Sequence, residues 1–94
     1  MSDAPPWQVY LIRCRDGALY TGATNDLARR LREHAAGGTA GAKYLRGKGP
    51  LALVFTCVVG TRAEALRAER RIKKLAREDK ERLVGGQLPL ADLV

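Results

Sequence analysis

A β-hairpin near the start of the chain constrains the fold more than any other feature of this sequence. WQVYLIRC (7–14) is typical of a strand, and ALYTGA (18–23) returns after the tripeptide RDG. A two-residue Asp-Gly turn would place Tyr10 and Tyr20 on opposite faces. A three-residue loop with its glycine left-handed pairs Tyr20 with Ile12 and makes Tyr10 its diagonal neighbour on the same face. Glycine in the third loop position favours this second arrangement, which we therefore predict.

The segments after the hairpin predict a helix, a short turn and a third strand. NDLARRLREHAA (25–36) is helical in pattern, with Thr24 or Asn25 as its N-cap. In the Gly-rich connection that follows, we expect one short helical turn around Ala42–Leu45. LALVFTCVV (51–59) is a continuous apolar run, whose length and β-branched residues favour a buried central strand.

The last third of the chain opens with the capping box formed by Thr61 and Glu64. The helix that starts there is predicted to run to about Arg77, with a further turn or two after it. The element order β-β-α-(α)-β-α predicts an α/β chain of the α+β type, with a small, mainly antiparallel three-stranded sheet flanked by helices.

The length of 94 residues fits one domain, 1–94. We expect its core over about 7–77 and tails at 1–6 and 84–94. The net charge of +7 indicates a polyanionic partner, for which an acidic membrane surface competes with nucleic acid.

No run reaches the ~18 apolar residues of a membrane-spanning helix, so we expect no membrane association. The N-terminus MSDAPPWQ lacks the basic and apolar regions of an export signal. Cys14 and Cys57 lie far apart in apolar runs, without neighbouring metal ligands. We therefore expect two reduced, mostly buried thiols, no zinc site and a cytoplasmic protein.

Polar residues lie along helix faces that should be buried. In the first helix, Leu27 and Leu31 mark the inner stripe, which Arg30 and His34 share. In the second helix Glu69 lies in the middle of a stripe that also holds Leu66, Ile72, Leu75 and Ala76. Each case has an ordinary explanation: Glu69 can pair with Lys73 at i+4, and strand tyrosines commonly lie at the edge of a core.

Taken together, five residues indicate one site between the hairpin and the two helices: Tyr10, Tyr20, Arg30, His34 and Glu69. A guanidinium stabilises the charge of a phosphorane-like transition state, and a lone carboxylate suits Mg²⁺. Tyrosine or histidine can relay the proton of an attacking water. Phosphodiester hydrolysis uses this set, whereas acyl transfer lacks a nucleophile–base pair.

The same residues resemble the signature of the GIY-YIG nuclease domain, in particular its small stand-alone bacterial members. QVY (8–10) stands where the family has G-I-Y, and YTG (20–22) where it has Y-I-G. GATNDLARRLREH is similar to G-x-[TA]-x-D-L-x-x-R-[LI]-x-x-H, which selects Arg30 over Arg29. AERRIKKL resembles the E-x-x-I-K segment that contains the metal ligand of the family. The first motif departs from the family at Gly-Ile, and the C-terminal asparagine of larger members is absent.

The resemblance implies a nuclease with a one-metal mechanism. Glu69 would hold Mg²⁺ (or Mn²⁺), and Tyr20 would be the base for the attacking water. Tyr10 and His34 would orient the reacting groups or relay a proton, and Arg30 would stabilise the charged phosphate. The implied substrate is DNA, single-stranded or branched, in repair or processing. RNA cleavage, endo- or exonucleolytic attack and the oligomeric state stay open.

Two other functions remain: a catalytically weak nucleic-acid-binding subunit that acts with a partner protein, and a basic structural domain without a site. Nine of the seventeen basic residues lie between Arg62 and Arg82. We expect nucleic-acid contacts from the Gly-rich connection and from the second helix, namely Lys43, Tyr44, Arg46, Lys48, Arg70 and Lys73. For Tyr44, stacking on a base and simple packing are equally open.

Overall fold

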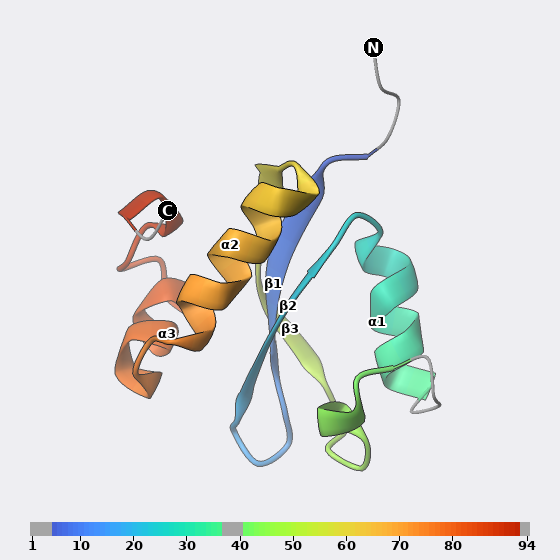
Figure 1. Ribbon diagram of the computed structural model, residues 1–94. Helices are drawn as coiled ribbons and strands as arrows, with labels where there is room; N and C mark the ends of the chain where they lie inside the picture. Colours follow the sequence, from blue (N-terminus) through green and yellow to red (C-terminus); the bar gives the residue numbers. More distant parts are fainter. Residues whose placement is uncertain (1–4, 37–40, 93–94) are drawn as a thin grey trace.

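A computed structural model describes residues 5–36 and 41–92 (Figure 1). Its elements are β1 (Trp7–Arg13), β2 (Leu19–Thr24), α1 (Leu27–Ala36), the 3₁₀ turn η1 (Lys43–Leu45), β3 (Ala52–Gly60), α2 (Arg62–Lys73), α3 (Arg77–Val84) and the 3₁₀ turn η2 (Leu90–Asp92). The strands form an antiparallel sheet in the order β2-β1-β3. The predicted α+β fold is confirmed, except that two helices rather than one follow β3. None of the described helices is long and apolar enough to cross a membrane.

The hairpin has the predicted three-residue loop. Tyr20 pairs with Ile12, and Tyr10 pairs with Gly22. Gly17 closes the loop at a φ of +88°, and its N–H donates to the carbonyl of Cys14 at 2.9 Å. Tyr10 and Tyr20 therefore lie on the same face of the sheet.

The predicted central position of the third strand is wrong, because β1 is the central strand and β3 lies at an edge. On β3, one face packs against the core through Val54, Phe55, Cys57 and Val59. The other face leaves Leu53 41% and Val58 62% exposed. A continuous apolar run makes both faces of a strand suitable for burial, but only one face of β3 is covered.

Alternate residues of β1 feed two separate cores, one on each face of the sheet. Val9 and Leu11 pack with buried residues of the C-terminal helices: Ala65, Ala68, Ile72 and Leu83. Tyr10 and Ile12 pack on the other face with Cys14, Leu45 and the inner stripe of α1. Figure 1 shows α1 on one side of the sheet and α2 with α3 on the other.

Several helix ends differ from the sequence prediction. Asp26, rather than Thr24 or Asn25, caps α1, because its Oδ1 accepts from the N–H of Arg29 at 3.1 Å. The capping box of α2 is confirmed, with both reciprocal hydrogen bonds present. However, α2 ends at Lys73, and α3 starts as a separate helix that carries Leu83 into the core.

The hairpin loop is fastened to α3 by charged side chains. Arg13 donates to both carboxylate oxygens of Glu81, at 2.6 and 2.9 Å. Arg77 donates to the carbonyl of Gly17 at 2.8 Å. The hydrogen bond from Arg13 holds the pKa of Glu81 below its usual value. These contacts fix the end of the hairpin that precedes Tyr20.

Candidate active site

A buried tyrosine–histidine pair forms the base of the candidate site. Tyr10 and His34 are 1% and 3% exposed, and the hydroxyl oxygen of Tyr10 lies 2.9 Å from Nε2 of His34. The backbone N–H of Ala42 donates to Nδ1 of His34 at 3.1 Å. Because an amide N–H can only donate, Nδ1 holds a lone pair and the ring proton lies on Nε2. The imidazole is therefore neutral and donates to the hydroxyl oxygen of Tyr10. The hydroxyl proton of Tyr10 takes no part in this hydrogen bond.

Burial keeps this pair neutral. Burial, followed by the neighbouring Tyr20, raises the pKa of Tyr10 to about 12, against a smaller opposing effect of the Arg30 guanidinium. Burial and then Arg30 lower the pKa of His34. Neither group gains or loses a proton readily at neutral pH, so the pair is suited to holding groups in place.

Tyr20 lies beside this pair in a cluster of rings. Its ring centroid is 6.4 Å from that of Tyr10 and 5.6 Å from that of His34, which it meets edge-on. Tyr44 stacks on Tyr20 at 6.0 Å, and the Lys48 ammonium lies 3.7 Å from the centroid of the Tyr44 ring. The predicted meeting of the two tyrosines and His34 is present in the structure.

The loop after η1 is tied to the hairpin at the same place. The N–H of Arg15 donates to the carbonyl of Lys48 at 3.0 Å, and the Lys48 ammonium lies 4.0 Å from Asp16. Residues 37–40 of the Gly-rich connection lie outside the described residues. Tyr44, in η1, therefore lies against Tyr20 just before the point where the chain is hydrogen-bonded to the hairpin.

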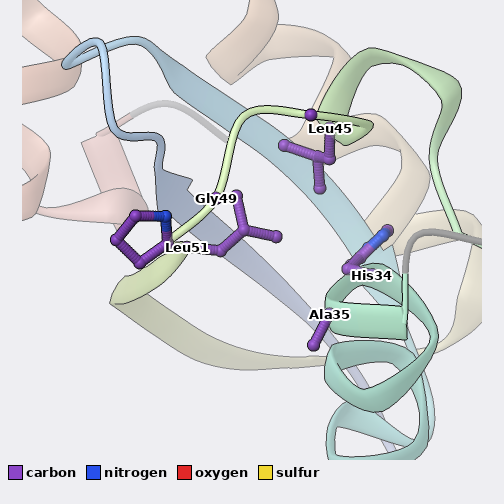
Figure 2. A pocket seen from close by; sticks show the side chains of 7 residues that line it. His34, Ala35, Leu45, Gly49 and Leu51 are labelled. Carbon is purple, nitrogen blue, oxygen red and sulfur yellow. The ribbon is translucent and has the colours of Figure 1, made fainter.

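Figure 2 shows this loop facing the last turn of α1 across a cavity. His34 and Ala35 face Leu45 and Leu51 across a cavity of about 220 Å³. His34 is the titratable group among the described residues that line the cavity. The walls are otherwise backbone and apolar side chains, which explains why the histidine is so strongly desolvated.

Gly22 is a functional position to which sequence reasoning gave no role. It lies opposite Tyr10 in the sheet, and a Cβ there would lie 2.4 Å from Cζ and from the hydroxyl oxygen of Tyr10. No real Cβ contact is this short, so the tyrosine ring occupies the space above this glycine. The signal was available, because the predicted register already pairs Gly22 with Tyr10.

Arg30 lies at the border of the tyrosine cluster. Its side chain is 28% exposed and contacts Glu33 at 3.1 Å. It is close enough to lower the pKa of Tyr10 through a hydrogen bond and its charge. The neighbouring Arg29 is exposed. The structure thus turns toward the site the same arginine that the sequence motif selects.

Glu69 approaches from the opposite face of the sheet. The buried stripe of α2 is Ala65, Ala68 and Ile72. Glu69 flanks this stripe with its side chain 18% exposed, so its predicted place in the middle of the stripe is wrong. After burial and Tyr20, its carboxylate makes the smallest contribution to the raised pKa of Tyr10.

The position of Glu69 changes where the site lies. Because α1 and α2 cover opposite faces, the site is not enclosed between them but spans the free edge of β2. Lys73 connects the two sides: it binds Glu69 at 3.1 Å and lines a cavity with Tyr20 and Tyr44. The ordinary reading of Glu69 as the partner of Lys73 is therefore also correct.

One carboxylate, Glu69, is the candidate ligand for a divalent cation. Among the described residues, no group of three or more His, Cys, Asp or Glu side chains gathers to hold a metal. Glu69 instead lies in a cavity of about 180 Å³ together with Leu66, Arg70 and Lys73. Mg²⁺ typically takes one or two carboxylates and completes its shell with water and substrate phosphate, which one accessible carboxylate permits.

The predicted nucleic-acid contacts lie on two surfaces. Lys43, Tyr44 and Arg46 are exposed on and beside η1, and Lys48 packs on Tyr44. Arg70 and Lys73 are exposed next to Glu69. Tyr44 also packs on Tyr20, so both readings of this residue apply to the structure.

Comparisons with known proteins show the family to which the chain belongs. The sequence model of the GIY-YIG catalytic domain matches residues 6–82. A UPF0213 protein of Cronobacter sakazakii is 58% identical over 82 residues, covering 87% of this chain and 84% of its own length. The UPF0213 protein YhbQ of Salmonella typhimurium is 60% identical over 79 residues, covering 84% and 77%.

Two solution structures determined by NMR are also similar. The UPF0213 protein BH0048 from Bacillus halodurans has a TM-score of 0.56 at 46% identity, covering 86% of this chain and 84% of that one. The protein EF2693 from E. faecalis has a TM-score of 0.62 at 39% identity, covering 92% and 90%. On the matched motif, the fold and these relatives, the chain belongs to the GIY-YIG family of nuclease-type domains.

Proposed function

We propose that this protein is a metal-dependent nuclease that hydrolyses phosphodiester bonds in DNA, with single-stranded or branched DNA as its substrate and a role in DNA repair or processing. The observation that supports the proposal is the neutral Tyr10–His34 pair beside Tyr20 and Arg30, with Glu69 across the β2 edge. We also propose a cytoplasmic location, which suits the two free cysteines, Cys14 and Cys57.

In this reaction water attacks the phosphorus while the bond to the leaving sugar oxygen breaks. Tyr20 takes the proton of the attacking water as its own hydroxyl proton passes to solvent water, and the leaving sugar oxygen takes up a proton from solvent. Tyr10, which accepts from His34, directs its own O–H toward the reacting groups and fixes the ring of Tyr20. Arg30 stabilises the negative charge that develops on the phosphate oxygens. Because Nδ1 of His34 is occupied by the Ala42 N–H, we assign His34 to orientation rather than to proton relay.

A divalent cation, Mg²⁺ or Mn²⁺, bound at Glu69 would neutralise charge on the phosphate and the leaving oxygen. The ammonium group of Lys73 lies 3.1 Å from this carboxylate. Its long, half-exposed side chain is free to move from Glu69 to a phosphate oxygen when a metal ion replaces it.

The proposal is tested with labelled single-stranded, duplex and branched DNA incubated with Mg²⁺, Mn²⁺ or EDTA. The wild-type protein should cut only with metal. Tyr20→Phe and Glu69→Ala should bind DNA but lose about 10²-fold or more of the cleavage rate. Glu78→Ala is the matched control, since Glu78 is an exposed carboxylate in the first turn of α3. Cleavage that survives both substitutions would contradict the assignment.

The second candidate function is a nucleic-acid-binding subunit that relies on a partner protein for efficient cleavage. The ion pair between Glu69 and Lys73 favours it, because a metal ion must compete with a bound ammonium group. Binding by the wild-type protein without cleavage under every metal condition would support this function over the first.

A further inference from the structure

The cavity that Lys73 lines with Tyr20 and Tyr44 lies outside the Tyr10–His34 pair. Its volume is about 300 Å³, and four elements or their borders supply its walls: Leu19, Tyr20, Thr21, Tyr44, Lys73 and Lys80. This volume is at the lower end of the range for ligand pockets, and the cavity is open to solvent. The cavity adjoins the proposed base and the ion-pair partner of the proposed metal ligand.

The walls of this cavity carry polar groups whose partners are missing. Within the described residues, Lys80 has no carboxylate within 4.0 Å. The hydroxyl oxygen of Thr21 is the single described side-chain polar atom that is buried without a hydrogen-bond partner. This oxygen has less than 1 Å² of exposed surface and is closed off from the cavity, so Lys80 is the wall group that is left to pair with a ligand.

The aromatic wall provides a surface for a base. Tyr44 is 47% exposed although its ring stacks on Tyr20. Lys48 lies over the same ring at 3.7 Å from its centroid, so a base that stacks on this ring displaces the ammonium group toward the phosphate. Exposed tyrosine beside two or three lysines is the combination by which proteins hold single strands, with the base on the ring and the phosphates on the cations.

We propose that this cavity binds one unpaired nucleotide of the substrate strand, next to the phosphate that is cut. Its phosphate lies between Lys73 and Lys80, and its base packs on Tyr44 and Leu19. A base inside a duplex is stacked on both sides and cannot stack on the exposed Tyr44 ring unless it leaves the helix. The cavity therefore selects single-stranded or frayed sites. This inference rests on the proposed function, since it names the strand that the nuclease site receives.

Binding is measured without cleavage, in EDTA, by fluorescence anisotropy of a labelled single-stranded thymidine oligonucleotide and of a duplex. Lys80→Ala should weaken single-strand binding about five-fold and lower the salt slope by about 0.7. Tyr44→Ala should weaken it about 5- to 100-fold. Lys74→Ala removes the same charge from the surface formed with Arg67, Arg70 and Arg71, and should cost less than about two-fold.

Backbone amide shifts locate the strand directly in a protein of this size. The oligonucleotide should shift the amides of Leu19, Thr21, Tyr44 and Lys80. Shifts confined to the surface around Lys74, or equal losses from Lys80→Ala and Lys74→Ala, would overturn the proposal. Thymidine monophosphate that binds as tightly as the oligonucleotide would also overturn it, because the ligand would then be a free nucleotide.

Failure of this inference can be told apart from failure of the proposed function. If the protein cuts DNA but the oligonucleotide shifts backbone amides elsewhere, the cavity proposal is wrong and the proposed nuclease function stands. If the protein binds the strand in the cavity but cuts no DNA with any metal, the cavity proposal stands and the proposed nuclease function is wrong.

Discussion

The contact between Gly22 and Tyr10 allows a quantitative test of how the site is built. In Gly22→Ala the new methyl group would lie 2.4 Å from Cζ and the hydroxyl oxygen of Tyr10, and 2.9 Å from Cε1. Tyr10 is only 1% exposed, so its ring cannot swing into solvent without opening the core. The ring must move sideways, and its hydrogen bond to His34 at 2.9 Å is then lost.

The expected cost follows from these contacts. Overpacking of a buried position costs about 1–3 kcal/mol, and loss of a buried hydrogen bond adds about 1 kcal/mol. Replacing glycine by alanine stiffens the unfolded chain, which offsets about 0.5 kcal/mol. The net loss in the free energy of unfolding should be about 1.5–3.5 kcal/mol, which lowers the melting temperature by roughly 6–28 °C.

Urea unfolding measures this loss, with Gly85→Ala as the control. Gly85 has a helical φ of −80°, and its nearest non-neighbouring atom would lie 3.4 Å from a Cβ, so alanine should cost less than about 0.5 kcal/mol. In a Tyr10→Leu background, which lacks Cζ and the hydroxyl, Gly22→Ala should also cost little. An equal cost in both backgrounds, or a cost in wild type as small as that of Gly85→Ala, would refute the reasoning.

Three further predictions concern His34, the contact between Arg13 and Glu81, and the two cysteines. The lowered pKa of His34 means that, below about pH 6.5, the unfolded chain binds more protons than the folded protein. The free energy of unfolding should therefore fall as the pH drops from about 6.5 to the lowered pKa, and urea titrations of His34→Gln should lack this component. Arg13→Ala and Glu81→Gln should each lower the urea midpoint, and the double variant should be no worse than Arg13→Ala, because both remove one interaction. A thiol reagent should modify the half-buried Cys57 before Cys14, which is 4% exposed and has a pKa raised by burial; equal rates would contradict the burial of Cys14.

Local sequence signals predicted the parts of the fold that neighbouring residues determine. The position of glycine in the RDG loop set the hairpin register and so the common face of Tyr10 and Tyr20. Thr61 and Glu64 marked the start of α2, because a capping box is complete within four residues. The choice of Arg30 over Arg29 followed from helical periodicity as well as from the motif.

Features that depend on distant packing were not predictable in this way. The order of strands depends on which helices cover which face of the sheet. An apolar run such as 51–59 does not indicate which of its two faces a helix will cover. The stripe of α2 was assigned one position off, because alanines at 65 and 68 give a weaker apolar signal than Leu66 although they pack closest to the sheet. As a result Glu69 was expected between two helices, whereas α2 lies on the opposite face of the sheet from α1, and Glu69 contacts Lys73, which lines a cavity with Tyr20.

The central claim is that residues from both faces of the sheet act as one site. Single-turnover cleavage of single-stranded DNA with Mg²⁺ tests it in four proteins: wild type, Tyr20→Phe, Glu69→Gln and the double variant. Groups that act as a unit give strongly non-additive losses. We predict that each single variant loses about 10²-fold or more and that the double variant is no slower than the slower single one. A double variant whose loss equals the product of the two single losses would show that Tyr20 and Glu69 act independently, which contradicts the account.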